Sequence, residues 1–488
     1  MAAIMIQGCG SDVGKSVLVA GLCRLFANRG LTVRPFKSQN MSNNAAVTAD
    51  GGEIGRAQAL QALACRVEPT VHMNPVLLKP ETDVGAQLIV RGKRAGTLNA
   101  RAHLEDKRAL LRVAVESYRQ LQQEADVMIV EGAGSPAETN LRANDIANMG
   151  FAEAVDVPVV LVGDIDRGHV IASLVGAHTV LGDADRSRIR GFIINKFRGD
   201  QTLFAEGTNT IVSHTGWQPL GIVPWLRAAN RLPSEDAVRL DSPYDASVSH
   251  AHVKIVVPVF SRISNFDDFD PLRLEPEVDL VFVPPGQSLP ADAALIILPG
   301  TKATIDEMAF FRAQGWDIDL IAHVRRGGRV LGICGGYQML GRAIHDPDGI
   351  EGVPASTSGL ALLDVETTMT PDKTLRATSG VTLNGSRFKG YEIHVGSTTG
   401  TATTRPMLHF DDGRPDGARS SDERIFGCYV HGLFNEVEVR RELLASLGAT
   451  STSRDHAHDV DSALDEIADI LSRCLDLRAL EFIAGFRK

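Results

Sequence analysis

The sequence predicts an α/β protein with two domains, on three observations. Its 488 residues exceed what one ordinary hydrophobic core organises. Short apolar runs alternate with helical patterns through the first half, and a second series of apolar runs follows a polar stretch. Near-continuous apolar strands separated by helices are typical of a mainly parallel sheet covered on both faces. We therefore expect one domain at 1–233, a linker at 234–251, a second domain at 252–447 and a helical tail at 448–488.

The expected strands are runs rich in Val, Ile, Leu and Met, bounded by polar residues, Gly or Pro. In the first domain they lie at 4–6, 33–36, 127–130, 158–162, 191–194 and 220–223. In the second domain they lie at 253–257, 280–283, 294–298 and 329–333. Helical patterns follow the first strand at 17–27 and occupy 463–478 in the tail.

Composition and charge favour a small-molecule partner. With 44% hydrophobic and 23% charged residues the chain has an ordinary globular composition. The net charge of −10 disfavours nucleic acid, and no apolar run approaches the ~20 residues that span a membrane. The six cysteines form no CxxC pair, so we expect a cytoplasmic protein without a cysteine-bound structural metal. Self-association into a homo-oligomer is left open.

A glycine-rich loop follows the first expected strand and precedes a helix. It reads GCGSDVGKS over residues 8–16, and we expect Gly8, Asp12, Gly14, Lys15 and Ser16 to bind the phosphates of ATP. Backbone amides would point at the phosphates, the lysine would add a positive charge and the serine hydroxyl would ligate Mg²⁺. The two bracketing glycines enclose five residues rather than the common four, a spacing that resembles dethiobiotin synthetase and its relatives. The alternative is a strand-to-helix turn with a solvated lysine.

Further residues are candidates for the same nucleotide site. Glu131 directly follows an expected strand, where its carboxylate would face the phosphates and ligate Mg²⁺. Glu53 is a second candidate ligand, with Asp50 as its rival. Asn195 ends another strand and resembles the asparagine that reads the base in this nucleotide-binding group, although a turn-forming role is the alternative.

A second chemical signature centres on Cys334, in the run Gly-Ile-Cys-Gly-Gly-Tyr-Gln between an expected strand and a helix. A helix N-terminus favours a thiolate, and flanking glycines leave room for a substrate. His431, at the end of an apolar run, would be the base. We expect the oxyanion to be stabilised by the amide of Gly335 and by one near Gly300. This order of nucleophile and histidine is that of class I glutamine amidotransferases, which release ammonia from glutamine.

The third member of this catalytic group stays open. Typical class I members carry a glutamate two residues after the histidine, but Leu433 stands there in this chain. Glu436 and Glu392 are nearby candidates that the sequence alone does not place.

The combination resembles the cobyric acid synthase family over essentially the whole chain. Besides the two motifs, the stretches 37–44, 262–270 and 390–394 look like those that set this family apart, and the related cobyrinic acid a,c-diamide synthases differ at 37–44. The resemblance implies a P-loop-type domain fused to a class I glutamine amidotransferase domain. It also implies amidation of the b, d, e and g carboxylates of adenosylcobyrinic acid a,c-diamide, with this corrinoid acid, glutamine and ATP as substrates.

Asparagines in the first of these stretches are candidate contacts for the corrinoid. Asn40, Asn43 and Asn44 would hydrogen-bond the amides and carboxylates at the rim of the ring, and an ordinary polar loop is the alternative. Two other functions compete with this interpretation: a related amide ligase acting on another acid, such as cobyrinic acid or a cell-wall precursor, and a nucleotide-dependent switch whose second domain is not catalytic.

Overall fold

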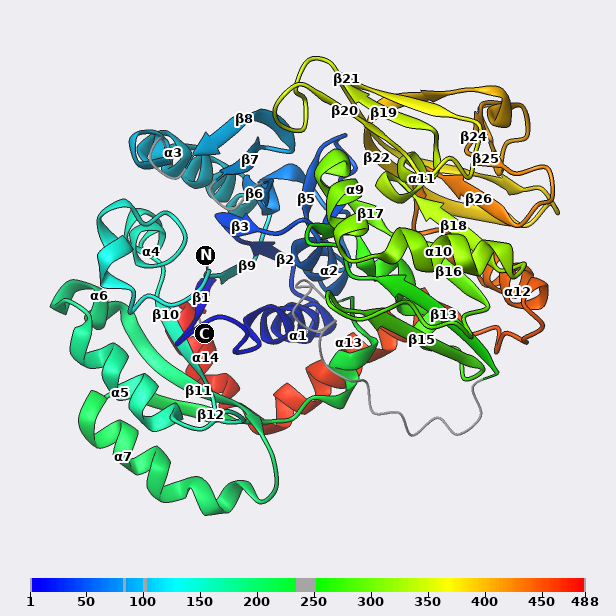
Figure 1. Cartoon of the computed structure of the whole chain (residues 1–488). Helices are drawn as coiled ribbons and strands as arrows, with labels where there is room; N and C mark the ends of the chain where they lie inside the picture. Colours follow the sequence, from blue (N-terminus) through cyan, green and yellow to red (C-terminus); the bar gives the residue numbers. More distant parts are fainter. Residues whose placement is uncertain (1, 82–84, 100–102, 234–251, 487–488) are drawn as a thin grey trace.

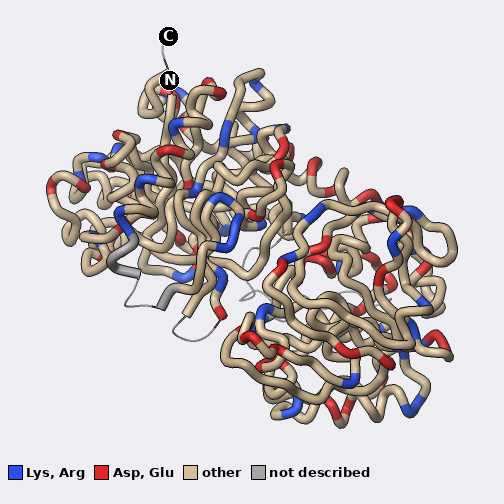
Figure 2. Tube along the Cα trace, turned by 90° about the horizontal axis from the view of Figure 1, so that it is seen from above, with Lys and Arg blue, Asp and Glu red and all other residues tan. Residues whose placement is uncertain are grey.

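The computed structural model describes residues 2–81, 85–99, 103–233 and 252–486. Figure 1 shows two α/β lobes, with the chain returning to the first lobe at its C-terminal end. The expected linker, 234–251, lies outside the described residues. Lys and Arg alternate with Asp and Glu over both lobes (Figure 2).

Among the described residues, the first domain contains a six-stranded sheet of order β12-β11-β10-β1-β9-β2. All its neighbouring strands are parallel, which confirms the predicted mainly parallel sheet. The strands are β1 (Ala2–Gly8), β2 (Val33–Phe36), β9 (Val127–Glu131), β10 (Val159–Asp164), β11 (Ile189–Phe197) and β12 (Gln218–Pro224).

Helices cover both faces of this sheet. Successive side chains of a strand point to opposite faces, so the apolar strands present apolar side chains on both faces that helices bury. Ile4 and Ile6 enter one hydrophobic core and Met5 enters the core on the other face. The helices of this domain are α1 (Lys15–Asn28), α2 (Arg56–Ala64), α3 (His103–Gln122), α4 (Met149–Val155), α5 (Val170–Val180), α6 (Asp183–Arg188) and α7 (Ala205–Thr215).

Short strands between β2 and α3 form a smaller layer that the sequence did not predict. The order β3-β6-β7-β8 makes one sheet, and β4 pairs with β5. These strands are β3 (Gln39–Met41), β4 (Ala45–Val47), β5 (Glu53–Gly55), β6 (Val76–Pro80), β7 (Gly85–Val90) and β8 (Lys93–Asn99). The layer contacts the second domain, where Ala45, Leu77 and Ile89 pack with Ile393.

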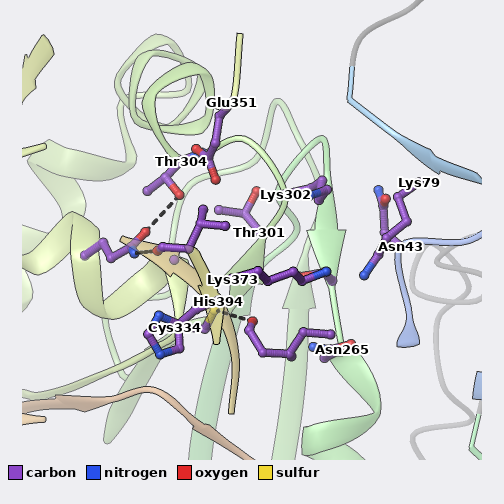
Figure 3. Close-up of a pocket in the computed structure, with 15 residues that line it drawn as sticks. Asn43, Lys79, Asn265, Thr301, Lys302, Thr304, Cys334, Glu351, Lys373 and His394 are labelled. Carbon is purple, nitrogen blue, oxygen red and sulfur yellow. Dashed lines mark hydrogen bonds between the residues drawn. The ribbon is translucent and has the colours of Figure 1, made fainter. Parts of the chain in front are cut away.

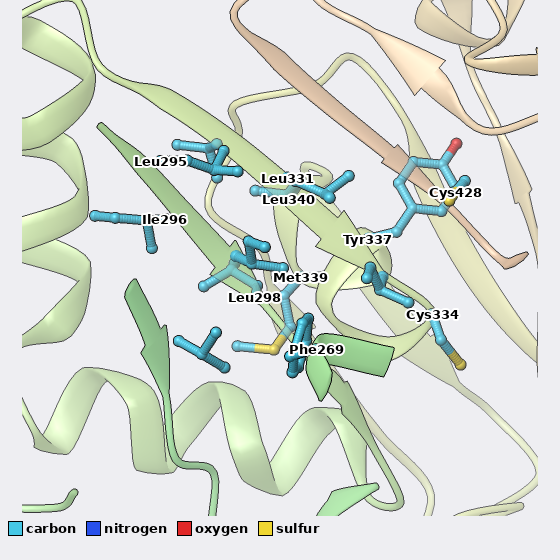
Figure 4. Packing of buried hydrophobic residues seen from close by; sticks show 14 of the residues in the cluster. Phe269, Leu295, Ile296, Leu298, Leu331, Cys334, Tyr337, Met339, Leu340 and Cys428 are labelled. Carbon is cyan, nitrogen blue, oxygen red and sulfur yellow. The ribbon is translucent and has the colours of Figure 1, made fainter. Parts of the chain in front are cut away.

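The second domain contains a sheet of order β15-β13-β16-β18-β26-β25, parallel except for β25. Its strands are β13 (Val253–Pro258), β15 (Val278–Val283), β16 (Leu295–Leu298), β18 (Arg329–Ile333), β25 (Ala418–Arg419) and β26 (Ile425–Cys428). The helices are α8 (Asp270–Arg273), α9 (Thr304–Ala313), α10 (Trp316–Arg325), α11 (Gly335–Leu340) and α12 (Val437–Ser446). Figure 4 shows Leu295, Leu298 and Leu331 of the sheet near Met339 and Leu340 of α11.

A largely antiparallel sheet stands beside this parallel one and was not predicted. Its long strands, β21 (Glu366–Thr382) and β22 (Arg387–Thr399), pair along most of their length. The others are β19 (Ala343–Asp346), β20 (Ala355–Ser358), β23 (Leu408–Phe410), β24 (Pro415–Asp416) and β27 (Val430–His431). A separate short pair joins β14 (Ile263–Ser264) to β17 (Gly300–Thr301).

The tail forms α13 (His456–Cys474) and α14 (Leu477–Ala484), and both helices join the core of the first domain. A Cβ placed on Gly21 of α1 would lie 2.6 Å from Ile467 and Leu471, so the glycine permits the close approach of α13. The buried Arg24 pairs with Asp461. The chain thus closes the first domain with its last helices. No described helix is long and apolar enough to cross a membrane.

Candidate active sites

The glycine-rich loop connects β1 to α1, as the sequence predicted. Gly14 has φ of 90°, a conformation that favours glycine, and a Cβ there would lie 2.4 Å from Asn195 Nδ2. Lys15 is buried, and its ammonium donates to Gly10 O at 2.9 Å and to Gly134 O at 3.3 Å. The loop thus places a buried lysine and a helix N-terminus together, as a phosphate site requires.

Glu131 and Ser16 meet behind this loop. The Ser16 hydroxyl donates to Glu131 Oε1 at 2.8 Å, and Lys37 Nζ donates to the same oxygen at 2.9 Å. Gln61 donates to the other oxygen. Burial would raise the pKa of the Glu131 carboxyl, but the charge of Lys37 and these hydrogen bonds lower it. An ionised carboxylate beside a serine hydroxyl fits the oxygen ligands that Mg²⁺ prefers.

A cavity of about 800 Å³ opens in front of the loop. Lys15 and Ser16 of the loop line it together with Lys37 and Glu131. The exposed apolar side chains of Met41 and Leu141 line it as well. Asp12 also lies on its wall, where its carboxylate is 3.1 Å from Arg167 Nη2. The cavity therefore combines phosphate-binding groups with an apolar rim.

Glu53 is not among the residues that line this cavity, so the geometry does not support its assignment as a Mg²⁺ ligand. Its buried carboxylate pairs with Lys79 at 2.8 Å and with Lys373 of the second domain. Burial would raise the pKa of Glu53, but the two ammonium groups lower it to about 2. Asp50, its rival, instead accepts a hydrogen bond from Val71 N.

Asn195 supports the loop and is absent from the residues that line the cavity. Its side-chain amide is buried and donates to Val13 O at 2.8 Å, directly beneath Gly14. The base-reading role is therefore not supported by this geometry.

Cys334 lies on the turn between β18 and α11, as predicted. Its φ of 52° is a strained value for a residue with a side chain, and such strain is common at nucleophilic elbows. A Cβ on Gly336 would lie 2.1 Å from Leu298 O, so the tight turn needs glycine there. In Figure 4 the sulfur lies at the edge of the hydrophobic cluster.

His431 lies on β27 and its imidazole is held by Asp268. The Asp268 carboxylate is 2.7 Å from His431 Nδ1, and its other oxygen accepts from Gly432 N at 2.7 Å. Burial would lower the pKa of His431, but Asp268 and a hydrogen bond with Cys334 raise it to about 10. A protonated imidazole beside the sulfur is the partner that a thiolate nucleophile needs.

Asp268 is the third member that the sequence left open. Neither earlier candidate takes this place: Glu392 pairs with Arg376 and Arg414, and Glu436 stands at the residue before α12. Asp268 lies on the 3-10 helix η6 (Phe266–Phe269), within the stretch 262–270. The run of acidic residues between buried phenylalanines in that stretch was the available signal.

Two of the candidate oxyanion donors lie close to each other in the cavity beside Cys334. Gly335 and Thr301 line the neighbouring cavity, and a Cβ on Gly335 would lie 3.2 Å from Thr301 N. Gly300 lies against the imidazole instead, since its Cβ would be 3.1 Å from His431 Cε1. This geometry favours the amide of Thr301, one residue beyond Gly300, as the second donor.

The cavity beside Cys334 is walled by both domains. Figure 3 shows Asn43 and Lys79 of the first domain on the side opposite Cys334, with Lys302 and Lys373 between them and Glu351 beside Thr304. Burial lowers the pKa of Lys302, and it lowers that of Lys373 to about 7. Burial also raises the pKa of Glu351 to about 7. Two amines and a carboxyl, all ionisable, therefore surround the space next to the thiol.

The three asparagines of the predicted corrinoid contact separate in the structure. Asn40 lines the cavity at the phosphate loop and Asn43 lines the one at Cys334. Asn44 is buried between the domains, where its side-chain oxygen accepts from Asn265 N at 2.6 Å. The geometry therefore leaves Asn40 as a corrinoid candidate and assigns Asn44 to the domain contact. No cluster of three or more His, Cys, Asp or Glu side chains suited to a metal occurs among the described residues.

Two family models match the two domains. Residues 4–239 match the CobQ/CobB/MinD/ParA nucleotide binding domain, and residues 254–439 match the CobB/CobQ-like glutamine amidotransferase domain. The chain is thus a nucleotide-binding domain fused to a glutamine amidotransferase domain.

Full-length relatives define the family more narrowly. Cobyric acid synthase of Caulobacter sp. (strain K31) is 65% identical over 99% of this chain and 100% of the relative. The cobyric acid synthases of Rhizobium rhizogenes and Rhizorhabdus wittichii are 60% and 59% identical, each over 99% of both chains. The chain belongs to the cobyric acid synthase family. Members of this family are ATP-dependent, glutamine-hydrolysing amide ligases.

Proposed function

We propose that this chain amidates the b, d, e and g carboxylates of adenosylcobyrinic acid a,c-diamide, with ammonia from glutamine and energy from ATP. The observation that carries the proposal is that one chain holds both a Cys334–His431–Asp268 group and a phosphate-loop cavity. Residues 1–233 would form the synthetase domain and 252–447 the glutaminase domain, joined by 234–251.

The glutaminase step begins at Cys334. Its thiolate attacks the side-chain carboxamide of glutamine, and the amides of Gly335 and Thr301 stabilise the oxyanion that forms. Protonated His431 gives its proton to the departing ammonia, and Asp268 keeps the ring oriented. Water, deprotonated by the same imidazole, then hydrolyses the glutamyl thioester and releases glutamate.

Charged groups at the cavity suit the other end of glutamine. Lys302 and Lys373 would bind its α-carboxylate, and Glu351 would bind its α-ammonium group. Both kinds of group are needed because free glutamine carries both charges. Glu351 is well placed for this role, since it accepts a hydrogen bond from Thr304 N at 2.7 Å and is thereby fixed.

The synthetase step takes place at the phosphate loop. A carboxylate is a poor acyl donor, so transfer of the γ-phosphoryl group of ATP would give an acyl phosphate that ammonia displaces. Lys15 stabilises the negative charge that develops on the transferred group, and the loop amides hold the remaining phosphates. Ser16 and Glu131 are the residues that would hold Mg²⁺, which neutralises phosphate charge when bound.

The corrinoid would enter the same cavity over its rim. A corrin presents apolar faces and a polar edge, and the exposed Met41 and Leu141 offer apolar contacts beside the polar Asn40. ATP and glutamine are both available in the cytoplasm, where we expect the reaction. Self-association into a homo-oligomer stays open, and the molecular mass of the protein in solution would test it.

Mass spectrometry of the corrinoid product tests this proposal. Incubation with the a,c-diamide, ATP, Mg²⁺ and glutamine should give successive species with one further amide each, and one ATP consumed per amide. Consumption of cobyrinic acid or of a cell-wall precursor in preference to the diamide would favour a related ligase. Nucleotide binding without any amidation would favour the regulatory switch.

A further inference from the structure

Both ring nitrogens of His431 contact one short segment of the glutaminase domain. Asp268 holds Nδ1 at 2.7 Å, and the Asn265 side-chain nitrogen lies 3.3 Å from Nε2. Asn265 and Asp268 are both 4% exposed, so the segment 265–268 is buried against the imidazole. The position of this segment therefore determines the position of the catalytic base.

The first domain contacts this segment at its N-terminal end through two hydrogen bonds. Asn44 accepts a hydrogen bond from Asn265 N at 2.6 Å, and Ala45 N donates to Asn265 Oδ1 at 3.2 Å. Asn265 has a left-handed φ of 52°, which these two contacts from the other domain help to hold.

Arg56, the first residue of α2 in the first domain, also contacts the segment, through an ion pair. Its Nε is 3.0 Å from the Asp267 carboxylate, the neighbour of Asp268. Its guanidinium also donates to the hydroxyl of Tyr391 and lies 5.3 Å from the centre of that ring. The Tyr391 ring in turn stacks on His431, with centroids 5.3 Å apart and an interplanar angle of 19°.

The ion pair with Asp267 holds Arg56 in a largely buried position. The side chains of Arg56 and Asp267 are 17% and 11% exposed. Burial raises the pKa of the Asp267 carboxyl, and the charge of Arg56 opposes that rise. Without the guanidinium, a buried acid next to Asp268 would lose its counter-charge and the segment would have to rearrange.

We infer that Arg56 of the synthetase domain is a positioning residue for His431, so that the glutaminase site is complete only when the two domains are docked. The inference rests on the glutaminase activity of the proposed function. Arg56 acts through two routes that converge on the same ring: Asp267 with its neighbour Asp268, and the stacked Tyr391.

Steady-state hydrolysis of glutamine by full-length variants tests this role. Arg56→Met should lower kcat for glutamate formation by at least about tenfold while KM changes little, because the base is displaced and the glutamine contacts remain. Arg56→Lys keeps the charge and should recover part of the lost kcat. Amidation from free ammonia should persist in both variants, which also shows that they fold.

Arg66→Met is the matched control. Arg66 follows the C-terminal end of the same helix, and its side chain is 56% exposed. This variant should hydrolyse glutamine at the wild-type rate. Tyr391→Phe is the second probe: it keeps the ring against His431, removes only the hydroxyl that Arg56 contacts and should also lower kcat rather than raise KM.

The outcomes distinguish the positioning role of Arg56 from the proposed function. Wild-type kcat in both Arg56→Met and Tyr391→Phe would overturn the positioning role, and so would a higher KM with unchanged kcat. If Arg56→Met also loses ammonia-dependent amidation, its lower kcat does not distinguish loss of positioning from misfolding. The kcat of Tyr391→Phe for glutamine hydrolysis is then the test of the positioning role. A wild-type protein that hydrolyses glutamine without amidating the corrinoid would overturn the proposed function and leave the positioning role intact.

Discussion

The Asp268 carboxylate contacts His431 Nδ1 at 2.7 Å, although the two residues are far apart in the sequence. The acid replaces the glutamate that class I glutamine amidotransferases usually carry two residues after the histidine, where this chain has Leu433. Because its second oxygen accepts from Gly432 N, the carboxylate cannot turn away from the ring. Orientation of the base and stabilisation of its positive charge therefore come from one side chain.

Replacing this acid should change both the rate and the pH dependence of glutamine hydrolysis. Asp268→Asn should lower kcat by at least about a hundredfold. Against the effect of burial, Asp268 together with Cys334 raises the pKa of His431 to about 10, so the imidazolium persists to that pH in the wild type. Without the carboxylate, burial dominates and the alkaline limb of the pH–rate profile should move to lower pH. An unmoved limb would contradict this role.

Cys334→Ser should abolish the use of glutamine and spare amidation from free ammonia, because the thiol acts only in the release of nitrogen. Ammonium chloride in place of glutamine provides the measurement. If a well-folded Cys334→Ser protein loses both activities, the proposed division of labour between the domains is wrong. If it loses neither, the second domain is not catalytic.

Lys15→Ala should remove amidation with either nitrogen source, since the buried ammonium lies at the phosphate loop, where it would face the transferred phosphoryl group. Labelled glutamine should still acylate Cys334 in this variant, which makes the label a control for folding. ATP turnover at the wild-type rate would argue against the assigned role of the loop lysine.

Lys302→Met should raise KM for glutamine and leave ammonia-dependent amidation unchanged. The lysine lines the cavity next to Cys334, where its charge would face the α-carboxylate. Hydrolysis measured over a range of glutamine concentrations checks this, and a variant with wild-type KM would remove Lys302 from the glutamine site.

Glu53 should contribute to stability in a defined pH range. Its folded pKa of about 2 lies below the ordinary 4.5, which corresponds to about 3 kcal/mol. For an acid with a lowered pKa, this contribution is present above pH 4.5 and is lost as the pH falls toward 2. Denaturant unfolding at pH 6, where Lys373 with its pKa of about 7 is still mostly protonated, should show Glu53→Gln to be destabilised by about 3 kcal/mol, because two buried ammonium groups then lack their partner.

A double variant provides the control for Glu53. Glu53→Gln combined with Lys373→Met removes one of the two facing charges and should recover part of the lost free energy of unfolding. Equal stability of the single variant and the wild type would show that the two ion pairs of Glu53 contribute nothing.

The sequence predicted the parallel sheets and the positions of both reactive motifs because these depend on local patterns. Apolar runs define buried strands, and a glycine-rich turn between strand and helix is recognisable without any distant contact. Lys15, Cys334 and His431 accordingly lie at the loop and strand ends where we expected them.

The remaining features depend on contacts between distant segments. Asp268 reaches His431 only through the packing of η6 beside β27, and Glu53 meets Lys373 only across the domain contact. The tail was predicted as helices, but nothing local indicates that α13 packs on α1. The antiparallel hairpin β21–β22 was missed because its exposed strands lack a continuous apolar run.

Transfer of labelled nitrogen tests the central claim most directly. The wild-type protein is given glutamine carrying nitrogen-15 in its side-chain amide, with ATP, Mg²⁺ and the a,c-diamide, and the corrinoid product is analysed by mass spectrometry. The account predicts that each new amide carries the label when ATP is present and that no amide forms without it. New amides that lack the label would contradict the account, because the nitrogen released at Cys334 would not be reaching the acid activated at the phosphate loop.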